Sequence, residues 1–314
     1  MITPHRRAAR IDELDAVRGF ALCGIMVVNA WQHTRQAVSD QAKVPYDVVV
    51  ENLLQSRFFP IFSFLFGVSL VLFLRSAGGD RVVLLRRLAV LALIGFAHTM
   101  VNPGEVLLPY ALFGLAVLVP ASFLPRLAVL LLGVGATGWA VWMGGGVVLV
   151  PGLFLLGMAF MEYRPPSGLV LPVFLVSAPL GAVLTWLWVI TSADGDTFVA
   201  GLYPLSGLIS ALAYCTGLLL LLRTPLRRPL TWALNPIGRM ALTNYVAGTP
   251  VILLTLPLLT ADQTHLAGLG LGAVTIAVQI AFSRWWLARF RYGPLEWVWR
   301  CLTWGELVRN RLDG

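Results

Sequence analysis

The stretch Arg10-Ile11-Asp12-Glu13-Leu14-Asp15-Ala16-Val17-Arg18-Gly19 runs directly into the apolar segment Phe20–Trp31. Together they predict a membrane-spanning helix over about residues 14–32. Asp15 and Arg18 are three positions apart, so they lie on one face of this helix and can form an ion pair. Charges at the edge of hydrocarbon are costly, and we therefore expect both side chains to have partners on other helices.

Composition extends this interpretation to the whole chain. The 314 residues are 58% hydrophobic and 12% charged, with a mean hydropathy of +0.80. A soluble domain has about 25% charged residues, so these values predict an all-α, polytopic membrane bundle that forms one transmembrane domain over residues 1–314. The net charge of +8 comes mostly from arginines beside apolar runs, which fits membrane topology and anionic lipid better than nucleic acid.

The first apolar segment is longer than the core of a signal peptide and lacks a small-residue cleavage site, so we expect it to remain as a span. The three cysteines, Cys23, Cys215 and Cys301, have no metal-ligand spacing. We interpret them as packing residues and expect no metal site.

Ten apolar segments predict ten spanning helices. They cover about 14–32, 58–74, 82–101, 106–123, 127–143, 147–161, 169–190, 198–222, 237–259 and 266–286. The fifth and sixth are joined by Gly144-Gly145-Gly146 and could form one interrupted hairpin. Residues 46–54 have apolar positions at helical spacing and are expected to lie on the outer membrane surface. Residues 292–309 are rich in tryptophan and predict an interfacial helix on the cytoplasmic side.

The basic residues alternate between loops. They occur before the first span, in every second loop and after the last span, including Arg6, Arg7, Arg10, Arg75, Arg81, Arg86, Arg87, Arg126, Arg164, Arg223, Arg227 and Arg228. The loops 102–105, 144–146, 191–197 and 260–265 contain no Lys or Arg. Because basic loops stay on the cytoplasmic side, both termini are expected there. The first outer loop is the exception, since it contains Arg35, Lys43 and Arg57.

This topology sorts the polar residues of the spans into two groups. The cytoplasmic group is Asp15, Arg18, Arg239, Thr243, Asn244, Tyr245, Glu296 and Arg300. The outer group is Asn29, His33, Arg57, His98, Glu105 and Tyr110. Only the first predicted span contributes to both groups.

The outer group contains a candidate catalytic pair. His98 and Glu105 flank a turn with Pro103 and Gly104, so antiparallel helices bring both side chains to the same level. A histidine oriented by a carboxylate is a general-base arrangement. A structural interpretation is equally open, because helix-end ion pairs, an interhelical amide bond and an interfacial histidine would explain the same residues.

Several sequence blocks resemble those of a known family. They are Leu14-Asp15-x-x-Arg18-Gly19-Phe20-Ala21-Leu22 with Val28-Asn29, Arg57-Phe58-x-x-Ile61-Phe62-Ser63-Phe64-Leu65-Phe66-Gly67, His98 with Gly104-Glu105-Val106-Leu107-x-x-Tyr110-Ala111-x-x-Gly114, Gly152-Leu153-Phe154-Leu155-Leu156-Gly157, Gly238-Arg239-Met240-Ala241-Leu242-Thr243-Asn244-Tyr245, and Tyr292-Gly293-Pro294-Leu295-Glu296-Trp297-x-Trp299-Arg300-x-Leu302-Thr303. On these blocks the chain resembles the YeiB-like family of bacterial membrane proteins, which implies a multi-pass protein of the bacterial cytoplasmic membrane. The family usually has Asp in place of Glu105 and often Lys in place of Arg57, and both changes keep the sign of the charge.

That family is similar, more distantly, to transmembrane acyltransferases of the heparan-glucosaminide acetyltransferase and acyltransferase-3 types. The resemblance implies transfer of an acyl group from cytoplasmic acyl-CoA, such as acetyl-CoA, to an extracytoplasmic or lipid-linked acceptor, a small molecule or a glycan. Acyl-CoA would be a co-substrate, and no permanently bound cofactor is expected. The residues expected to bind acyl-CoA are Asp15, Arg18, Arg239, Asn244, Glu296 and Arg300, whose arginines suit phosphate groups. The expected catalytic residues are His98 and Glu105, with His33 as the alternative base, and the expected acceptor-binding residues are Asn29, Arg57 and Tyr110.

Two other classes remain open at this point. Charged groups at both membrane faces would also serve a transporter or exporter of a small metabolite. A non-catalytic membrane protein, with purely structural polar residues, would have the same composition. The sequence leaves a homodimer open as well.

Overall fold

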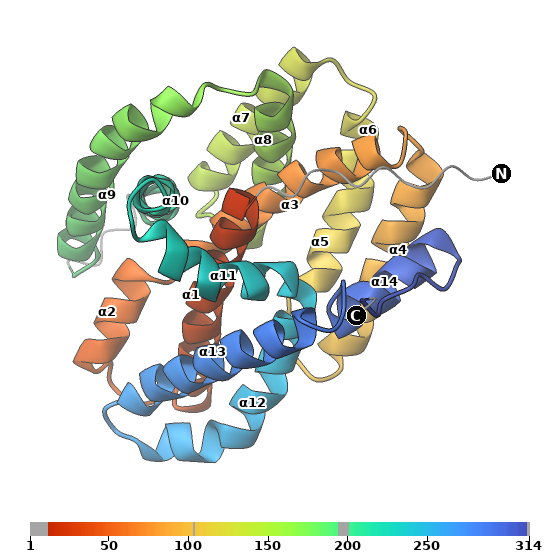
Figure 1. Cartoon of the computed structure of the whole chain (residues 1–314). Coiled ribbons are helices and arrows are strands. Elements are labelled where there is room, and N and C mark those ends of the chain that lie inside the picture. Colours follow the sequence, from red (N-terminus) through yellow and green to blue (C-terminus); the bar gives the residue numbers. More distant parts are fainter. Residues whose placement is uncertain (1–11, 103, 194–200, 313–314) are drawn as a thin grey trace.

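The computed structural model describes residues 12–102, 104–193 and 201–312 (Figure 1). Over these residues the chain is helical and forms no β-strand, apart from one isolated backbone bridge between Phe290 and Arg311. The predicted basic N-terminal residues Arg6, Arg7 and Arg10 lie outside the described residues, as does part of the loop 191–197.

The elements, in chain order, are α1 (Asp12–Ala37), α2 (Pro45–Leu53), α3 (Phe58–Ser76), α4 (Arg81–Thr99), α5 (Leu107–Phe113), a π-helical segment (Gly114–Leu118), α6 (Val119–Ala121), α7 (Arg126–Trp142), a 3-10 turn (Gly146–Val148), α8 (Leu149–Tyr163), a second 3-10 turn (Ser167–Leu169), α9 (Val170–Ala193), α10 (Leu202–Leu221), α11 (Arg227–Arg239), α12 (Ala241–Ala261), α13 (Leu266–Leu287) and α14 (Pro294–Trp304).

Eight helical stretches of the described chain are long and apolar enough to cross a membrane. They are Asp12–Ala37, Pro45–Ser76, Arg81–Thr99, Gly146–Tyr163, Ser167–Ser192, Leu202–Leu221, Ala241–Ala261 and Leu266–Leu287. The predicted spans 106–123 and 127–143 correspond to two shorter apolar helices, Leu107–Ala121 and Arg126–Trp142. The prediction of an all-helical, polytopic membrane bundle is confirmed.

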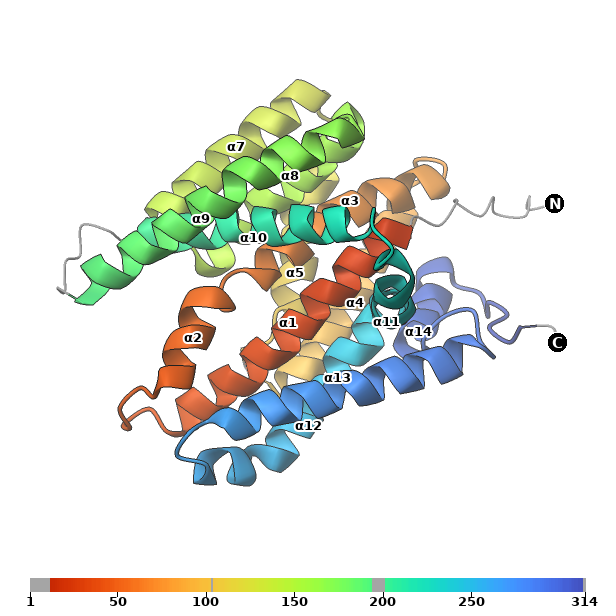
Figure 2. The ribbon, with the colours of Figure 1, turned by 60° about the vertical axis from the view of Figure 1, so that its left-hand side comes forward.

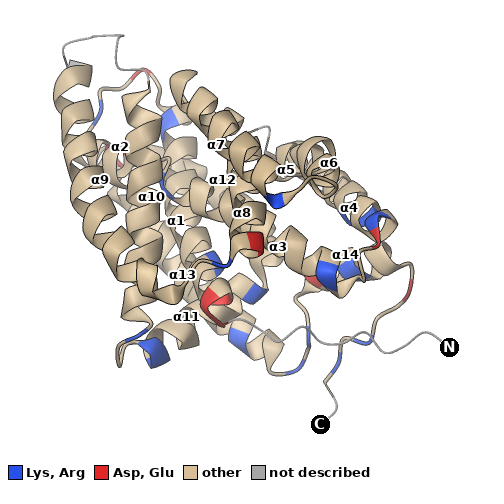
Figure 3. Ribbon diagram, turned by 90° about the horizontal axis from the view of Figure 1, so that it is seen from above, with Lys and Arg blue, Asp and Glu red and all other residues tan. Residues whose placement is uncertain are grey.

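Helix α1 runs through the middle of the bundle (Figure 2). It packs against α3, α11, α12 and α13. In Figure 2, α7 to α10 lie above α1, and α12 and α13 lie below it. Figure 3 shows long uncharged stretches in α9 and α10, with Lys, Arg, Asp and Glu gathered near α11, α14 and the start of α4. The central position of α1 places Asp15, which is buried, and the partly buried Arg18 among neighbouring helices, where they form their ion pair.

Two glycines let the start of α1 approach α11 closely. A Cβ atom at Gly19 would collide with the carbonyl oxygen of Leu234, and one at Gly238 would collide with that of Asp15. The backbones of α1 and α11 are therefore in direct contact. This contact brings Gly238, more than 200 positions away in sequence, beside Asp15 and Arg18.

The Gly19→Val substitution is expected to destabilise the fold, because the new side chain would force two helical backbones apart. Overpacking of this kind lowers stability by about 1–3 kcal/mol. The matched control is Gly135→Val in α7, where a Cβ atom would meet nothing within 4 Å. Thermal unfolding in detergent should show a lower midpoint for Gly19→Val than for Gly135→Val, and equal midpoints would contradict this packing.

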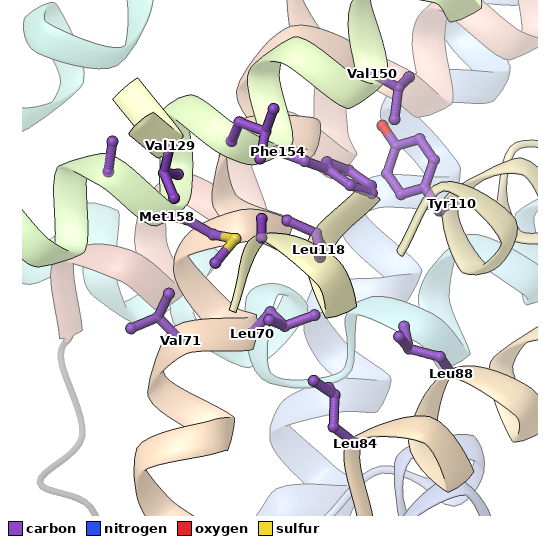
Figure 4. Close-up of a cluster of buried hydrophobic side chains, with 13 residues drawn as sticks. Leu70, Val71, Leu84, Leu88, Tyr110, Leu118, Val129, Val150, Phe154 and Met158 are labelled. Carbon is purple, nitrogen blue, oxygen red and sulfur yellow. The ribbon is translucent and has the colours of Figure 1, made fainter. Parts of the chain in front are cut away.

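A hydrophobic cluster joins α3, α4, α7 and α8 to the segment that begins with α5 (Figure 4). The rings of Phe66 and Phe154 stack with centroids 4.8 Å apart, and Tyr110 meets Phe154 edge to face at 5.2 Å. This cluster fixes the position of Tyr110, one of the predicted site residues.

The predicted ninth span, 237–259, is wrong at its start. Residues 237–239 belong to α11. The helical conformation is interrupted at Met240, and α12 begins at Ala241. The break is stabilised from a distant part of the chain: Glu296 of α14 accepts hydrogen bonds from the backbone N–H groups of Leu242 and Thr243. Such donors at the start of a helix have no intrahelical partner, so the cap allows a new helix to begin there.

The predicted fourth span, 106–123, is helical only from Leu107 to Ala121 and contains the π-helical segment Gly114–Leu118. The predicted amphipathic segment 46–54 forms α2, with Asp47 and Val50 buried against the bundle. The predicted interfacial segment 292–309 is helical over 294–304 only.

Candidate functional site

A cavity of about 960 Å³ lies beside α1. The residues of α1 that line it are Arg18, Ile25, Val28, Asn29, Gln32, His33 and Gln36. Their spacing follows one face of the helix. Arg18 and Gln36 are separated by about 27 Å at 1.5 Å per residue, so the cavity follows most of α1. We call the region around Arg18 the arginine end and the region around His33 and Gln36 the amide end.

The arginine end begins with the predicted ion pair. Nη1 of Arg18 lies 3.1 Å from Oδ1 of Asp15, and Nη2 donates to Oγ of Ser69 at 2.8 Å. Nη1 also reaches the carbonyl oxygen of Gly238 at 3.5 Å. The expected contact between this ion pair and the helix that carries Gly238 is therefore present.

Four arginines line the arginine end: Arg18, Arg87, Arg239 and Arg300. The guanidinium carbon of Arg87 lies 3.7 Å from the ring centroid of Trp299 and 4.5 Å from that of Phe73. That of Arg300 lies 4.9 Å from the ring of Tyr292. Neither Arg87 nor Arg300 donates a side-chain hydrogen bond to any described residue. Both guanidinium groups therefore have unused N–H donors that can bind an anion.

Glu296 lines the same end but serves as a helix cap. Its carboxylate accepts from the backbone N–H groups of Leu242 (2.7 Å) and Thr243 (3.0 Å) and from the Thr243 hydroxyl (2.6 Å). Burial raises the pKa of the Glu296 carboxyl, against the opposing effect of these three donors.

The Glu296→Gln substitution is expected to loosen the start of α12. A carboxamide offers one acceptor oxygen and turns N–H groups toward the donors of Thr243 and Leu242, which a carboxylate satisfies completely. Losing charged hydrogen bonds lowers stability by about 1.5–3 kcal/mol. Thermal unfolding should show a lower midpoint than for the control Glu306→Gln, whose side chain is exposed and has no hydrogen bond to the described chain.

Two predicted acyl-CoA ligands do not line the cavity. Asn244 donates from Nδ2 to the carbonyl oxygen of Ile237 at 3.3 Å and to Oγ of Ser283 at 3.1 Å, so it links α11, α12 and α13. Asp15 lies behind Arg18 and holds its guanidinium in place. Arg18, Arg239, Glu296 and Arg300 do line the cavity.

His33 lines the amide end. Its Nδ1 lies 2.9 Å from the carbonyl oxygen of Asn29. Because a carbonyl oxygen can only accept, Nδ1 carries the proton and Nε2 of the neutral ring carries the lone pair. Nε2 has no hydrogen bond to any described residue, so this nitrogen remains available as a base.

His98 and Glu105 meet as the sequence predicts, but outside the cavity lining. Nδ1 of His98 lies 3.3 Å from Oε2 of Glu105, and Nε2 lies 3.0 Å from the hydroxyl of Thr249. Glu105 also accepts from the backbone N–H groups of Leu107 and Leu108, both at 2.6 Å. Both side chains are buried. The predicted pairing is confirmed, and the predicted catalytic role stays a prediction.

Of Arg57 and Tyr110, only Tyr110 lines the cavity. Arg57 is fully buried, donates from Nη1 to the carbonyl oxygen of Gln55 at 2.7 Å, and does not line the cavity. Tyr110 lines the cavity, and its hydroxyl lies 2.6 Å from Oγ of Ser63. Asn29 also lines it. The predicted outer group is therefore not one cluster.

Several lining residues were missed from sequence. The most informative are Arg87, Gln32, Gln36, Gln55, Asn102 and Trp299. Arg87 lies inside the predicted span 82–101, and a charge within a span is by itself a signal of function. The amides lie at predicted span ends and in loops, where sequence alone gives no reason to single them out.

Fold and cavity define the class: a polytopic helical membrane protein with an internal cavity that is cationic at one end and neutral and polar at the other. The family described as "Protein of unknown function (DUF418)" matches residues 162–306. An "Uncharacterized 39.9 kDa protein in amylase 3'region" of Bacillus acidopullulyticus is 33% identical over 330 residues, covering 95% of this chain and 94% of that protein.

Two further relatives align over nearly the full length. "Uncharacterized protein YeiB" of Escherichia coli is 28% identical over 92% of this chain and 95% of its own. "Uncharacterized protein YxaH" of Bacillus subtilis is 24% identical over 96% of each chain. The chain belongs to this YeiB-like family of membrane proteins. No solved structure matches it.

Proposed function

We propose that the protein is a membrane acyltransferase that moves an acyl group from acyl-CoA at the arginine end to an acceptor at the amide end. The observation that carries the proposal is one cavity along a single face of α1, with four arginines at one end and a histidine with an available nitrogen at the other. By the positive-inside rule the arginine end faces the cytoplasm, in a bacterial cytoplasmic membrane with both termini inside.

The arginine end suits the phosphate groups of coenzyme A. Arginine binds phosphate oxygens through two parallel hydrogen bonds, and Arg87 and Arg300 have free donors for this purpose. Their aromatic neighbours hold the guanidinium planes in place, so less side-chain entropy is lost on binding.

The wall between the two ends is mostly apolar. Ile25, Phe62, Phe66, Leu65 and Val150 line it together with Tyr110. Such a wall suits the pantetheine arm and the acyl chain of the donor, whose thioester would extend from the arginine end toward His33.

His33 is the base in this proposal. Its Nδ1–H is held by the carbonyl oxygen of Asn29, which orients the ring and leaves Nε2 to accept a proton from the acceptor. His98 is the less suitable base, because both of its ring nitrogens have protein partners and it does not line the cavity.

The test is binding and transfer with radiolabelled acetyl-CoA, using purified protein in lipid nanodiscs. Equilibrium binding should be saturable, competed by coenzyme A, and weakened when salt screens the phosphate contacts. Incubation with a membrane extract should then yield labelled product. Failure to bind acetyl-CoA would contradict the proposal, and so would uptake of a metabolite into proteoliposomes without any acyl transfer.

A further inference from the structure

Residues 291–310 form a loop whose two ends lie together. The backbone N–H of Arg291 donates to the carbonyl oxygen of Asn310 at 2.8 Å. Two residues further out, the N–H of Leu312 donates to the carbonyl oxygen of Arg289 at 2.9 Å. A compact loop whose ends are joined in this way meets the rest of the chain at a single junction. We call this segment the cap.

The cap is held together by its own contacts. Helix α14 fills its first part and ends at Gly305, which adopts the left-handed conformation with φ +70°. The chain then returns along the helix: Nε1 of Trp297 donates to the carbonyl oxygen of Val308 at 2.7 Å, and the N–H of Val308 lies 3.4 Å from Sγ of Cys301. Because these contacts join the helix to the returning segment, the cap can move as one unit.

The cap forms one wall of the arginine end. Helix α14 lies beside α4 and α12 (Figure 1). Its residues Glu296, Trp299 and Arg300 line the cavity, and their i, i+3, i+4 spacing places them on one face of the helix. Val298 and Leu302 are instead exposed. A displacement of the cap would therefore change access to the arginine end directly.

Most of the cap's contacts with the bundle are polar. Thr303 is the one fully buried residue of α14, while Leu295 and Trp299 are only partly buried against their hydrophobic cluster. The firmest contacts are the three hydrogen bonds that Glu296 accepts at the start of α12, and the bond from Nε1 of Trp299 to the carbonyl oxygen of Arg87 at 2.8 Å. Segments with few buried apolar contacts open more readily than the core.

Two like charges oppose each other across the closed cap. Arg300 lies on the cap and Arg87 on α4, near enough for their charges to interact. Their repulsion disfavours the closed position. An anion between them would bind both guanidinium groups and favour closure, because a ligand shifts an equilibrium toward the state that it binds more tightly.

We propose that the cap is a hinged lid over the arginine end, which opens about the junction of its two ends and closes when a polyvalent anion bridges Arg87 and Arg300. Opening breaks the bonds between Glu296 and α12 and separates Trp299 from Arg87. The cavity then becomes accessible from the side on which the cap lies. This inference concerns entry into the cavity, and it holds for any polyvalent anion that binds there, whether or not acyl transfer follows.

The first experiment measures access to the arginine end with a cysteine. Ser69 lines the cavity beside Arg18. In protein whose three native cysteines are replaced by serine, Ser69→Cys is labelled with a membrane-impermeant thiol reagent in inside-out membrane vesicles. Adding Glu296→Gln weakens the bonds that hold the cap closed, so the labelling rate should rise about tenfold. A change of less than about twofold would overturn the inference.

Two controls separate opening of the cap from general loosening. Asp262→Asn is matched to Glu296→Gln, because Asp262 also accepts from two backbone N–H groups and a threonine hydroxyl, but at the start of α13 and outside the cavity lining. It should leave the labelling of Ser69→Cys unchanged. Ser177→Cys reports unfolding, because Ser177 is buried and lies outside the lining. Faster labelling of Ser177→Cys in the Glu296→Gln background, or of Ser69→Cys with Asp262→Asn, would contradict the inference.

The second experiment tests closure by an anion. The backbone N–H groups of Leu242 and Thr243 are bonded to Glu296 only while the cap is closed, so their hydrogen exchange reports opening. In nanodiscs, inorganic pyrophosphate should slow this exchange about threefold or more, and Arg300→Gln should abolish the effect. Arg86→Gln is the control and should retain it, because Arg86 is exposed and outside the lining. Exchange that ignores pyrophosphate, or slows equally in Arg300→Gln, would overturn the inference.

Discussion

Replacing His33 with alanine is expected to lower acyl transfer by about 10²–10⁴-fold, the usual contribution of a general base. The expectation follows from one geometric fact: Nδ1–H is held by the Asn29 carbonyl at 2.9 Å, so the unprotonated Nε2 is free for the acceptor. Because the arginine end is untouched, the dissociation constant of acetyl-CoA should stay within about twofold. Transfer is measured with labelled acetyl-CoA in nanodiscs and binding by equilibrium dialysis.

His98→Gln is the comparison that separates the two candidate bases. His98 has partners on both ring nitrogens, in Glu105 and Thr249, and should act through structure alone. The variant is therefore expected to lower the thermal midpoint while the folded fraction retains most of its transfer rate. Loss of transfer in His98→Gln with full activity in His33→Ala would instead support the pair that sequence alone favours.

Replacing Arg87 and Arg300 together with glutamine should weaken acetyl-CoA binding by about 100-fold or more. Each guanidinium has donors that no described residue uses, and a charge-assisted hydrogen bond contributes about 1.5–3 kcal/mol, or roughly tenfold or more in affinity. Glutamine keeps a polar side chain of moderate length, so the aromatic packing around Trp299 and Tyr292 changes less than it would with alanine.

Arg86→Gln provides the matched control. Arg86 precedes Arg87 on α4 but is exposed and does not line the cavity. Its loss should leave the acetyl-CoA dissociation constant near the wild-type value, and the salt dependence of binding should persist. Equal weakening in Arg86→Gln and in the double variant would mean that general surface charge, rather than the arginine end, attracts the coenzyme.

Local sequence signals predicted two side-chain contacts, although only Arg18 of the four residues involved lines the cavity. The spacing of Asp15 and Arg18 predicts their ion pair, because i,i+3 neighbours share a helical face. The turn between His98 and Glu105 predicts their contact, because a short connection forces adjacent helices to be antiparallel. Both inferences need only local geometry.

The cavity and the cap of α12 could not be predicted in this way. Which face of α1 borders empty space depends on how α3, α4 and α12 pack around it, and no local pattern encodes that arrangement. The helix break at Met240 depends on Glu296, which is more than 50 positions away in sequence. His33 follows the predicted span 14–32 and has no carboxylate beside it in sequence, so sequence favoured His98, although of the two only His33 lines the cavity.

The central claim is that one cavity joins a donor site and an acceptor site along α1. The most direct test is an experimental structure in nanodiscs with a non-hydrolysable acetyl-CoA thioether analogue. The account predicts phosphate density within hydrogen-bonding distance of Arg87 and Arg300, with the thioether extended past Phe66 toward His33. Coenzyme density outside the cavity, or an acyl end pointing away from the amide end, would contradict it.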